Sequence, residues 1–206
     1  MPLPVIGAYI ARVRFSLRIH PLMFQPGQIC TFPAYVVVLA FLHPVPAAAE
    51  VVDAGASGFN TRHSVTISRP RAEVYKAAVR EVGSWWSSDH TVSGHASNLY
   101  IDAGTPGCFC EKLGEGGGVV HMTVTFVNPG VMLRLSGGLG PLGLMGVMGN
   151  MTWEFADEGE GTAVTWQYAV GGYLPDGLES VAGAVDRVLA EQMQALKVFA
   201  ENAEPL

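Results

Sequence analysis

Apolar and polar residues alternate with a period of two over most of the chain between residues 98 and 170. The run 164–170 is typical, because Val, Trp, Tyr and Val occupy every second position in it. Turn sequences separate the runs, Gly-Glu-Gly-Gly-Gly at 114–118 and Asn-Pro-Gly at 128–130. Successive side chains of a strand point to opposite faces. The pattern therefore predicts an antiparallel sheet with one packed face and one solvated face.

The segment before this region predicts a strand followed by helix. Residues 59–68 alternate as a half-buried strand. Pro70 is suited to the first turn of a helix, where its missing N–H costs nothing. Gly83 ends or bends this helix, and the pair Trp85-Trp86 follows in a short second helix or turn.

The last part of the chain predicts one long amphipathic helix. Apolar residues follow i, i+3, i+4, i+7 spacing from Leu178 to about Asn202. At 1.5 Å per residue such a helix is roughly 37 Å long, enough to cross a whole sheet. A strand, a helix pair, antiparallel strands and a long helix make an α+β order. The sheet covers its apolar face only if it curls around the last helix.

The first 49 residues differ from the rest. Three arginines and no acidic residue precede an apolar run at 34–42, and the segment ends in Ala47-x-Ala49. This order predicts an export signal, and the run is too short to span a bilayer of about 30 Å. The mature domain would then be 50–206, beginning with a short lead-in at 50–58, and would be periplasmic or secreted. The alternatives are an uncleaved, poorly ordered extension or a true start at Met23, in which case the protein would be cytoplasmic.

Composition excludes several classes of protein. Apolar residues make up 49% of the chain and charged residues 15%, with a formal net charge of −6. Removing residues 1–49 takes away three arginines and no acidic residue, so the net charge becomes −9. Disorder and nucleic-acid binding both require more charge than this, and an acidic surface repels nucleic acid and anionic membranes.

Cysteine spacing predicts neither a disulfide nor a metal site. Cys108 and Cys110 are two residues apart, so on an extended strand they lie about 7 Å from each other. That distance is long for a disulfide, whose Cβ atoms are about 3.8 Å apart. The C-x₂₋₄-C spacing of zinc sites is absent from the sequence. We expect no metal and no cofactor.

Short motifs accompany the predicted elements and carry a resemblance. On these motifs residues 63–199 resemble the SRPBCC superfamily, whose START-like, polyketide cyclase/dehydrase and birch-pollen-allergen-like members share a helix-grip fold. The chain looks closest to the branch often labelled chaperone-ATPase-activator-like. The resemblance implies a curved antiparallel β-sheet wrapped around a long C-terminal α-helix, but this fold hosts carriers, receptors and cyclases alike. The motifs are Ser68-Arg69-Pro70, Trp85-Trp86, Gly107-Cys108-Phe109-Cys110-Glu111, Leu133-Arg134-Leu135, Gly140-Pro141-Leu142, Trp153-Glu154-Phe155 and Val185-Asp186-Arg187-Val188-Leu189.

Three polar residues fall on faces predicted to be apolar. They are His63 and Glu111 on strands and Gln192 on the last helix. Burying a polar group without a partner costs about 1–3 kcal/mol, so we interpret the three as groups that orient a ligand in a cavity. In the alternative, His63 and Glu111 hydrogen-bond each other as a buried pair, or the predicted register is wrong by one residue. His121 lies opposite the apolar face of its strand and is expected at the surface.

Two further sets of residues complete the candidate site. Residues 137–149 place Leu, Met and Val among glycines and a proline, which suits a flap over a cavity mouth, a surface for a partner protein, or a buried crossover. The expected cavity walls are Trp86, Phe109, Trp153, Trp166 and Tyr168, and the expected gate residues are Leu139, Leu142, Leu144, Met145 and Met148.

The leading hypothesis is a non-catalytic protein that binds or carries a small apolar or amphipathic molecule between the sheet and the C-terminal helix. One alternative is a polyketide cyclase/dehydrase-type enzyme, in which burial raises the pKa of Glu111 and Glu111 works with His63 in acid–base catalysis. Another is a protein-interaction module that docks through the loop 137–149. The expected partner is a small hydrophobic molecule, with no nucleic acid and no stable membrane span. The oligomeric state and the identity of the ligand stay open.

Overall fold

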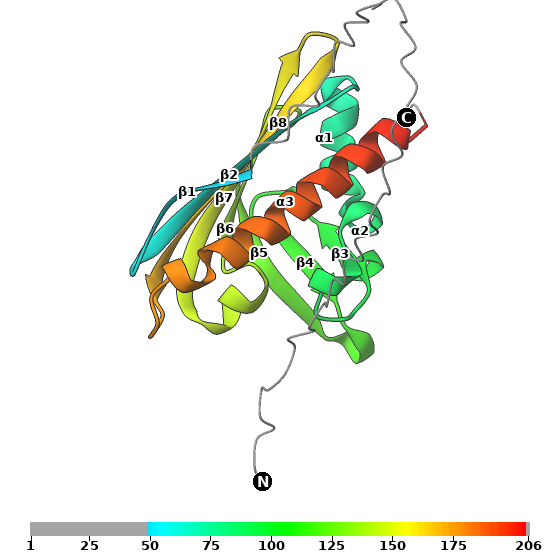
Figure 1. The fold of residues 1–206 in the computed structure, drawn as a ribbon. Helices are drawn as coiled ribbons and strands as arrows, with labels where there is room; N and C mark the ends of the chain where they lie inside the picture. Colours follow the sequence, from blue (N-terminus) through cyan, green and yellow to red (C-terminus); the bar gives the residue numbers. More distant parts are fainter. Residues whose placement is uncertain (1–48, 205–206) are drawn as a thin grey trace, which may run out of the picture. The chain divides into compact units, whose positions relative to one another are not determined.

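The computed structural model describes residues 49–204, so the predicted export signal lies almost wholly outside the described residues. The described part contains a single antiparallel sheet of eight strands in the order β1-β2-β8-β7-β6-β5-β4-β3 (Figure 1). The strands are β1 (Ala49–Gly55), β2 (Gly58–Ile67), β3 (Leu99–Ile101), β4 (Cys108–Lys112), β5 (Gly118–Asn128), β6 (Met132–Gly137), β7 (Gly146–Glu158) and β8 (Gly161–Tyr173).

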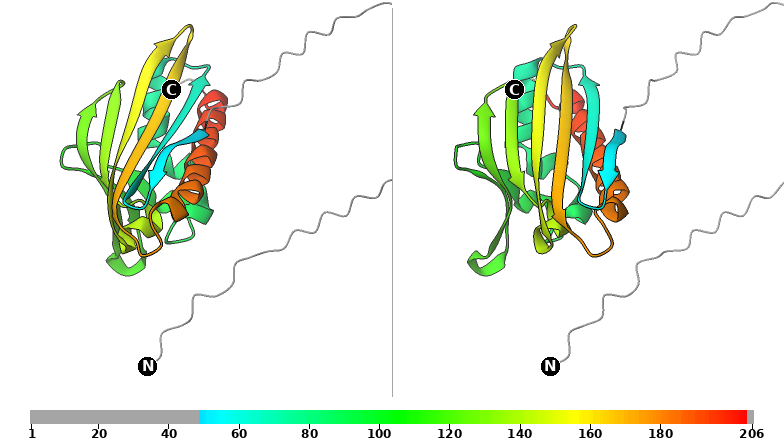
Figure 2. Two further views of the ribbon diagram at one scale, coloured as in Figure 1. Left: turned by 60° about the vertical axis from the view of Figure 1, so that its left-hand side comes forward. Right: turned by 90° about the vertical axis from the view of Figure 1, so that its left-hand side faces the viewer.

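Three α-helices lie on one face of this sheet. The long helix α3 (Glu179–Asn202) crosses the concave face, and α1 (Arg71–Arg80) and α2 (Val82–Trp85) lie beside it (Figure 1). The other face of the sheet carries no helix of the described residues (Figure 2). Short 3₁₀ turns are η1 (Ser88–His90), η2 (Ala96–Asn98), η3 (Gly114–Gly116) and η4 (Gly140–Leu144). The predicted α+β helix-grip architecture is confirmed.

The core lies between the concave face and α3. Inward positions of β7 and β8 follow the predicted alternation, and Trp153 and Trp166 are 0% and 1% exposed. Their rings stack with centroids 4.7 Å apart, and the ring of Trp85 lies 6.2 Å from Trp153 and 5.9 Å from Trp166. Helix α3 contributes Leu189, Met193 and Leu196 to the same core. Aromatic pairs of this kind add about 0.5–1.5 kcal/mol each beyond the burial of their area.

The helix pair forms where Pro70 and Gly83 predict it, with one change of boundary. Pro70 is the N-cap of α1, and the helix ends at Arg80 rather than at Gly83. Gly83 lies inside α2, where a Cβ atom would be 3.0 Å from the carbonyl oxygens of Ala96 and Leu99. The glycine therefore allows α2 to pack closely on the segment that leads into β3.

Two strands differ from the sequence-based expectation. Residues 49–55, read from sequence mainly as a lead-in, form β1, which pairs with β2 at the sheet edge. Strand β5 contains two bulges, at His121 and at Thr125, and each inserts one residue between paired positions. An inserted residue shifts the following side chains to the other face. Val120 and Phe126, which strict alternation with Met122 and Val124 would place inward, are therefore 64% and 42% exposed.

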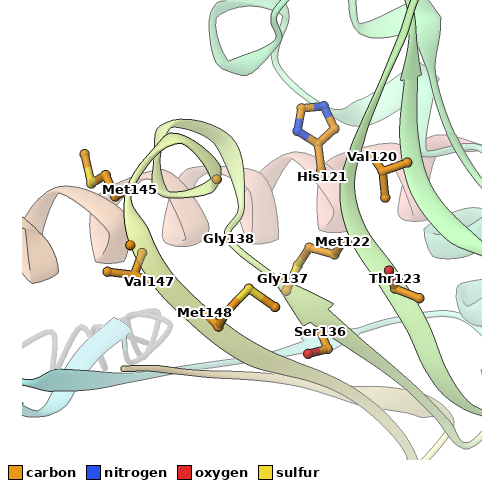
Figure 3. Close-up of a pocket in the computed structure, with 12 residues that line it drawn as sticks. Val120, His121, Met122, Thr123, Ser136, Gly137, Gly138, Met145, Val147 and Met148 are labelled. Carbon is orange, nitrogen blue, oxygen red and sulfur yellow. The ribbon is translucent and has the colours of Figure 1, made fainter. Parts of the chain in front are cut away.

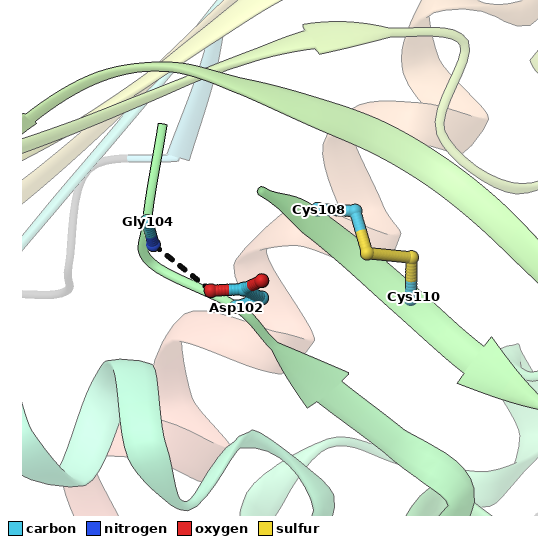
Figure 4. The surroundings of a disulfide bond; sticks show 4 residues. All are labelled: Asp102, Gly104, Cys108 and Cys110. Atoms are coloured by element: carbon cyan, nitrogen blue, oxygen red, sulfur yellow. Dashed lines mark hydrogen bonds between the residues drawn. A yellow bond between two sulfur atoms is a disulfide. The ribbon is translucent and has the colours of Figure 1, made fainter. Parts of the chain in front are cut away.

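The prediction that Cys108 and Cys110 are too far apart to bond is wrong. The two residues form a disulfide, and their Cα atoms are only 5.4 Å apart (Figure 4). The backbone here is not fully extended, since two residues of a regular strand span about 6.6 Å. The turn before β4 is held by Asp102, whose carboxylate accepts a hydrogen bond from the Gly104 N–H at 3.0 Å (Figure 4).

Candidate functional site

A pocket of about 410 Å³ lies where β5 extends past the end of β6 (Figure 3). The two strands pair only from Thr123–Ser136 to Asn128–Met132, and after Gly137 the chain leaves the sheet in the loop 138–145 before it starts β7. The first part of β5 therefore faces this loop across a gap. The lining residues are Val120, His121, Met122, Thr123, Ser136, Gly137, Gly138, Gly143, Met145, Gly146, Val147 and Met148.

Glycine lets the loop fold back on itself beside the pocket. A Cβ atom at Gly138 would lie 2.7 Å from the Gly143 nitrogen and 2.8 Å from the Leu142 carbonyl oxygen. Such contacts are too short for any larger residue without a shift of the backbone. The loop can therefore turn inward, and it buries Leu142 to 4% exposure.

His121 is the titratable residue of the pocket lining, and it is buried rather than at the surface as expected. It is 7% exposed, because the bulge in β5 turns both His121 and Met122 inward. Its Nε2 atom lies 2.9 Å from a carboxylate oxygen of Glu111, and its ring centroid is 5.6 Å from that of Phe109. The bulge thus places a histidine–carboxylate pair beside the pocket.

Glu111 is held as a carboxylate. It is 1% exposed and accepts hydrogen bonds from the backbone N–H groups of Val92 at 3.0 Å and Ser93 at 2.5 Å. Burial acts to raise the pKa of Glu111, but the hydrogen bonds from Ser93, Val92 and His121 outweigh it and lower the pKa to about 2. The expected raised pKa is therefore wrong, and Glu111 is not a protonated general acid near neutral pH.

The charge of Glu111 determines where His121 carries its proton. An ionised carboxylate only accepts hydrogen bonds, so the neutral His121 ring holds its proton on Nε2 and donates it to Glu111. Among residues 49–204, no hydrogen bond is formed by Nδ1 of His121. The ring stands on β5 with one nitrogen turned toward the loop 138–145 (Figure 3).

His63 and Gln192 each have a partner other than Glu111. Nε2 of His63 lies 3.2 Å from Asp186 of α3, without the geometry of a hydrogen bond. Burial lowers the pKa of His63, and the charge of Asp186 acts in the opposite direction. The Gln192 side-chain oxygen accepts a hydrogen bond from the Ser87 N–H at 2.8 Å. The alternative in which His63 and Glu111 form a pair is therefore wrong.

Seven buried polar side-chain atoms have no hydrogen-bond partner among the described residues. They belong to residues of β2, β7, β8 and α3, and His63, Trp166 and Trp153 occupy one row across three neighbouring strands. Leaving one such atom unpaired costs about 1–3 kcal/mol, so each calls for a water or ligand partner. The atoms are Thr61 Oγ1, His63 Nδ1 and Nε2, Trp153 Nε1, Trp166 Nε1, Asp186 Oδ1 and Gln192 Nε2.

The five aromatic residues predicted as cavity walls are all buried. Trp86 packs on Phe109 with centroids 5.3 Å apart, and Phe109 reaches His121. Tyr168 instead ties the loop to the sheet: its hydroxyl donates to the Gly137 carbonyl and accepts from the Leu139 N–H, both at 3.0 Å. Burial raises the pKa of Tyr168 to about 12.

The five predicted gate residues divide between the core and the surface. Leu142 is buried, Leu139 and Met145 are half-buried, and Leu144 and Met148 are 93% and 61% exposed. Met145 and Met148 line the pocket. Sequence reasoning missed His121, Met122, Ser136 and Val147 as lining residues, since no sequence signal marks a bulge in β5.

Within residues 49–204, no three His, Cys, Asp or Glu side chains lie close enough together to hold a metal ion. No helix of the described chain is long and apolar enough to cross a membrane.

A curved antiparallel sheet that holds one long C-terminal helix on its concave face defines a helix-grip protein, here with a pocket beside the free end of β6. The chain belongs to the polyketide cyclase/dehydrase and lipid transport family, whose model matches residues 58–201. No curated protein matches the chain.

Solved structures share the fold at low sequence identity. A putative uncharacterized protein from Rhizobium leguminosarum has 15% identity and a TM-score of 0.56, covering 73% of this chain and 100% of its own. A protein from Mesorhizobium loti has 14% identity and a TM-score of 0.52, with 71% and 99% covered. A protein from Chromobacterium violaceum has 14% identity and a TM-score of 0.50, with 70% and 98% covered. At these identities the likeness extends to the fold alone.

Proposed function

We propose that this domain binds a small amphipathic molecule at the pocket between β5, the end of β6, the loop 138–145 and the start of β7. The observation that carries the proposal is the pocket of about 410 Å³ with the buried His121 in its lining. Its volume is within the range of about 300–1,000 Å³ typical of ligand sites. The family description, polyketide cyclase/dehydrase and lipid transport, supports a ligand of this kind.

The lining suits a molecule with a long apolar part and a small polar end. Met122, Met145, Val147 and Met148 supply adaptable apolar contacts, and His121 supplies a polar one. We propose that the ligand extends from this pocket past His121, toward the interior where Trp86 and Phe109 pack.

The loop 138–145 is the gate in this proposal. The Tyr168 hydroxyl on β8 holds the start of the loop, because it accepts a hydrogen bond from the Leu139 N–H and donates one to the carbonyl of Gly137, the residue before the loop. The side chain of Leu142 is buried, whereas that of Leu144 is 93% exposed. An outward movement of the loop would break the hydrogen bonds to Tyr168, expose Leu142 and open the pocket.

Native mass spectrometry of the protein purified from its own host tests binding directly. We expect an added non-covalent mass on the wild-type domain. Ser136→Phe, which fills the pocket, removes most of that mass. Thr125→Phe is the matched control, because Thr125 lies on β5 outside the pocket lining and is exposed. A wild-type protein without added mass, or equal mass on both variants, contradicts the proposal.

A docking role for the same end of the sheet is a second candidate. Leu144, Met148 and Tyr173 are 93%, 61% and 74% exposed, and Tyr173 pairs with Gly146 at the end of the loop. Leu144→Ser should then abolish capture of a partner protein and leave the bound small molecule unchanged. Loss of the small molecule with no change in captured proteins contradicts docking.

We also propose that the protein is exported and cleaved after Ala49. Cleavage there leaves all of β1 except its first residue in the mature chain. A disulfide between Cys108 and Cys110 supports an oxidising compartment. N-terminal sequencing of protein from the cell exterior or periplasm should begin at Glu50, and a chain that keeps residues 1–49 contradicts the proposal.

A further inference from the structure

The pocket contains one polar side chain whose hydrogen-bonding role is set by its surroundings. His121 is 7% exposed, and its Nε2 is occupied by the Glu111 carboxylate at 2.9 Å. Glu111 is itself fixed by the N–H groups of Val92 and Ser93. The ring therefore cannot turn over without leaving a buried carboxylate short of one partner.

The remaining nitrogen, Nδ1, is consequently an acceptor. A neutral imidazole has one protonated and one bare nitrogen, and the carboxylate holds the proton on Nε2. No group of residues 49–204 donates to Nδ1, so this nitrogen is available to a donor on a ligand in the pocket. The other lining residues carry no acidic or basic group, and only Thr123 and Ser136 among them have a side-chain hydroxyl.

We propose that His121 recognises a hydroxyl group of the ligand, a phenol or an enol on an otherwise apolar molecule, through a hydrogen bond from the ligand O–H to Nδ1. Glu111 is the positioning residue that holds the proton of the neutral ring on Nε2 and so leaves Nδ1 as the acceptor. This inference rests on the proposed ligand-binding function and adds the chemical class of the ligand. It also gives a reason for the bulge in β5, because a regular strand would turn His121 away from the pocket.

Three fluorescent probes of one size test the recognition: 2-naphthol, 2-methoxynaphthalene and 2-naphthoate, titrated against the full chain at neutral pH. The naphthol carries the O–H donor, the methyl ether lacks it, and the naphthoate carries an anion. One hydrogen bond predicts that 2-naphthol binds about three- to tenfold more tightly than the ether.

Two variants separate the nitrogens of the ring. His121→Asn places an amide oxygen near the position of Nδ1 but does not reach Glu111, whereas His121→Gln reaches Glu111 and offers nothing at Nδ1. We expect His121→Asn to keep most of the preference for naphthol and His121→Gln to lose it. Since His121→Gln keeps the Glu111 contact, loss of preference in that variant is not a folding defect. Thermal unfolding of both variants checks this.

Glu111→Ala tests the positioning role. Oε2 of Glu111 accepts a hydrogen bond from the Val92 N–H and contacts Nε2 of His121, whereas the Ser93 N–H donates to Oε1. Without the carboxylate the proton of the neutral His121 ring is no longer fixed on Nε2, and the naphthol preference falls toward unity. The ¹⁵N shifts of the His121 ring report this change of tautomer directly, which a merely structural role of Glu111 would not produce.

The outcomes distinguish the two proposals. If no probe binds the wild type and the host protein carries no added mass, the proposed function fails. If naphthol and ether bind equally, or if naphthoate binds best, the ligand-binding function stands and hydroxyl recognition by His121 is overturned.

Discussion

The two halves of the sheet differ in regularity, apart from one register shift between β1 and β2 at the sheet edge. Strands β7 and β8 pair over thirteen residues each without a register shift, and their inward side chains form a close-packed aromatic core. The pairing of β4 with β5 is interrupted by one bulge, and so is the pairing of β5 with β6. The pocket lies beside these strands. Regular alternation thus builds the core of this domain, and interrupted alternation makes room for a ligand.

Trp153→Ala tests the regular half and should have the largest effect. Trp153 is fully buried and stacked on Trp166, so its loss leaves a large cavity and costs about 3–5 kcal/mol in the free energy of unfolding. Urea denaturation measures this loss in the free energy of unfolding. The control Met148→Ala, at an exposed residue of the same strand, should change stability by no more than about 0.5 kcal/mol. Similar losses for both would contradict the assigned core.

Acid denaturation tests the irregular half. The folded-state pKa of Glu111 is lowered from 4.5 to about 2. Its contribution, about 3 kcal/mol, is therefore present above pH 4.5 and is lost as the pH falls toward 2. Glu111→Gln should flatten the stability profile in this window, and Glu115→Gln, at an exposed residue of the following turn, should not. Equal slopes of stability against pH for wild type and Glu111→Gln would show that the hydrogen bonds from Val92, Ser93 and His121 do not stabilise the Glu111 carboxylate.

Tyr168→Phe tests the link between the two halves. The Tyr168 hydroxyl, on regular β8, makes two hydrogen bonds at the start of the gate loop. Its removal should cost about 1–3 kcal/mol and speed hydrogen exchange in the loop 138–145. Tyr100→Phe is the control, because Tyr100 is 41% exposed. Unchanged exchange in the loop would mean that Tyr168 does not hold the gate.

The smallest expected effect concerns His63 beneath α3. Burial lowers its pKa below the ordinary value of 6.5, so folding favours the neutral ring. The contribution of neutral His63 to the free energy of unfolding is fully present above pH 6.5 and decreases as the pH falls below it. His63→Gln should remove this slope between pH 7 and 5. His95→Gln, at an exposed histidine, leaves it unchanged. A stability that rises on acidification would instead indicate that the charge of Asp186 dominates.

Much of the fold follows from the pattern of side chains alone. The strand at 58–67 and the helix α3 lie within one or two residues of their predicted positions, because each has an unbroken apolar periodicity. Strand β8 (Gly161–Tyr173) extends beyond the predicted run 164–170 at both ends, and β7 starts at Gly146, inside the predicted loop 137–149. Strand β1 was not predicted, since an edge strand of small and acidic residues carries no apolar alternation.

The candidate site was predicted less completely. Glu111 and Gln192 are buried as their positions on apolar faces predict, but their partners come from segments far away in the sequence. His121 was assigned to the wrong face because a bulge inserts a residue without leaving a mark in composition or spacing. The same local departure from the extended backbone allows the disulfide between Cys108 and Cys110.

The sequence by itself determined the fold class, most of the apolar core and the burial of His63, Glu111 and Gln192, because the apolar periodicity of a strand or helix is a property of its own residues. Only the tertiary structure decided that Glu111 pairs with His121, that His63 faces Asp186, and that a pocket lies beside β5. These depend on register, on bulges and on loops that bring distant backbone groups to one place, and such long-range pairing is not encoded in any single stretch of the chain.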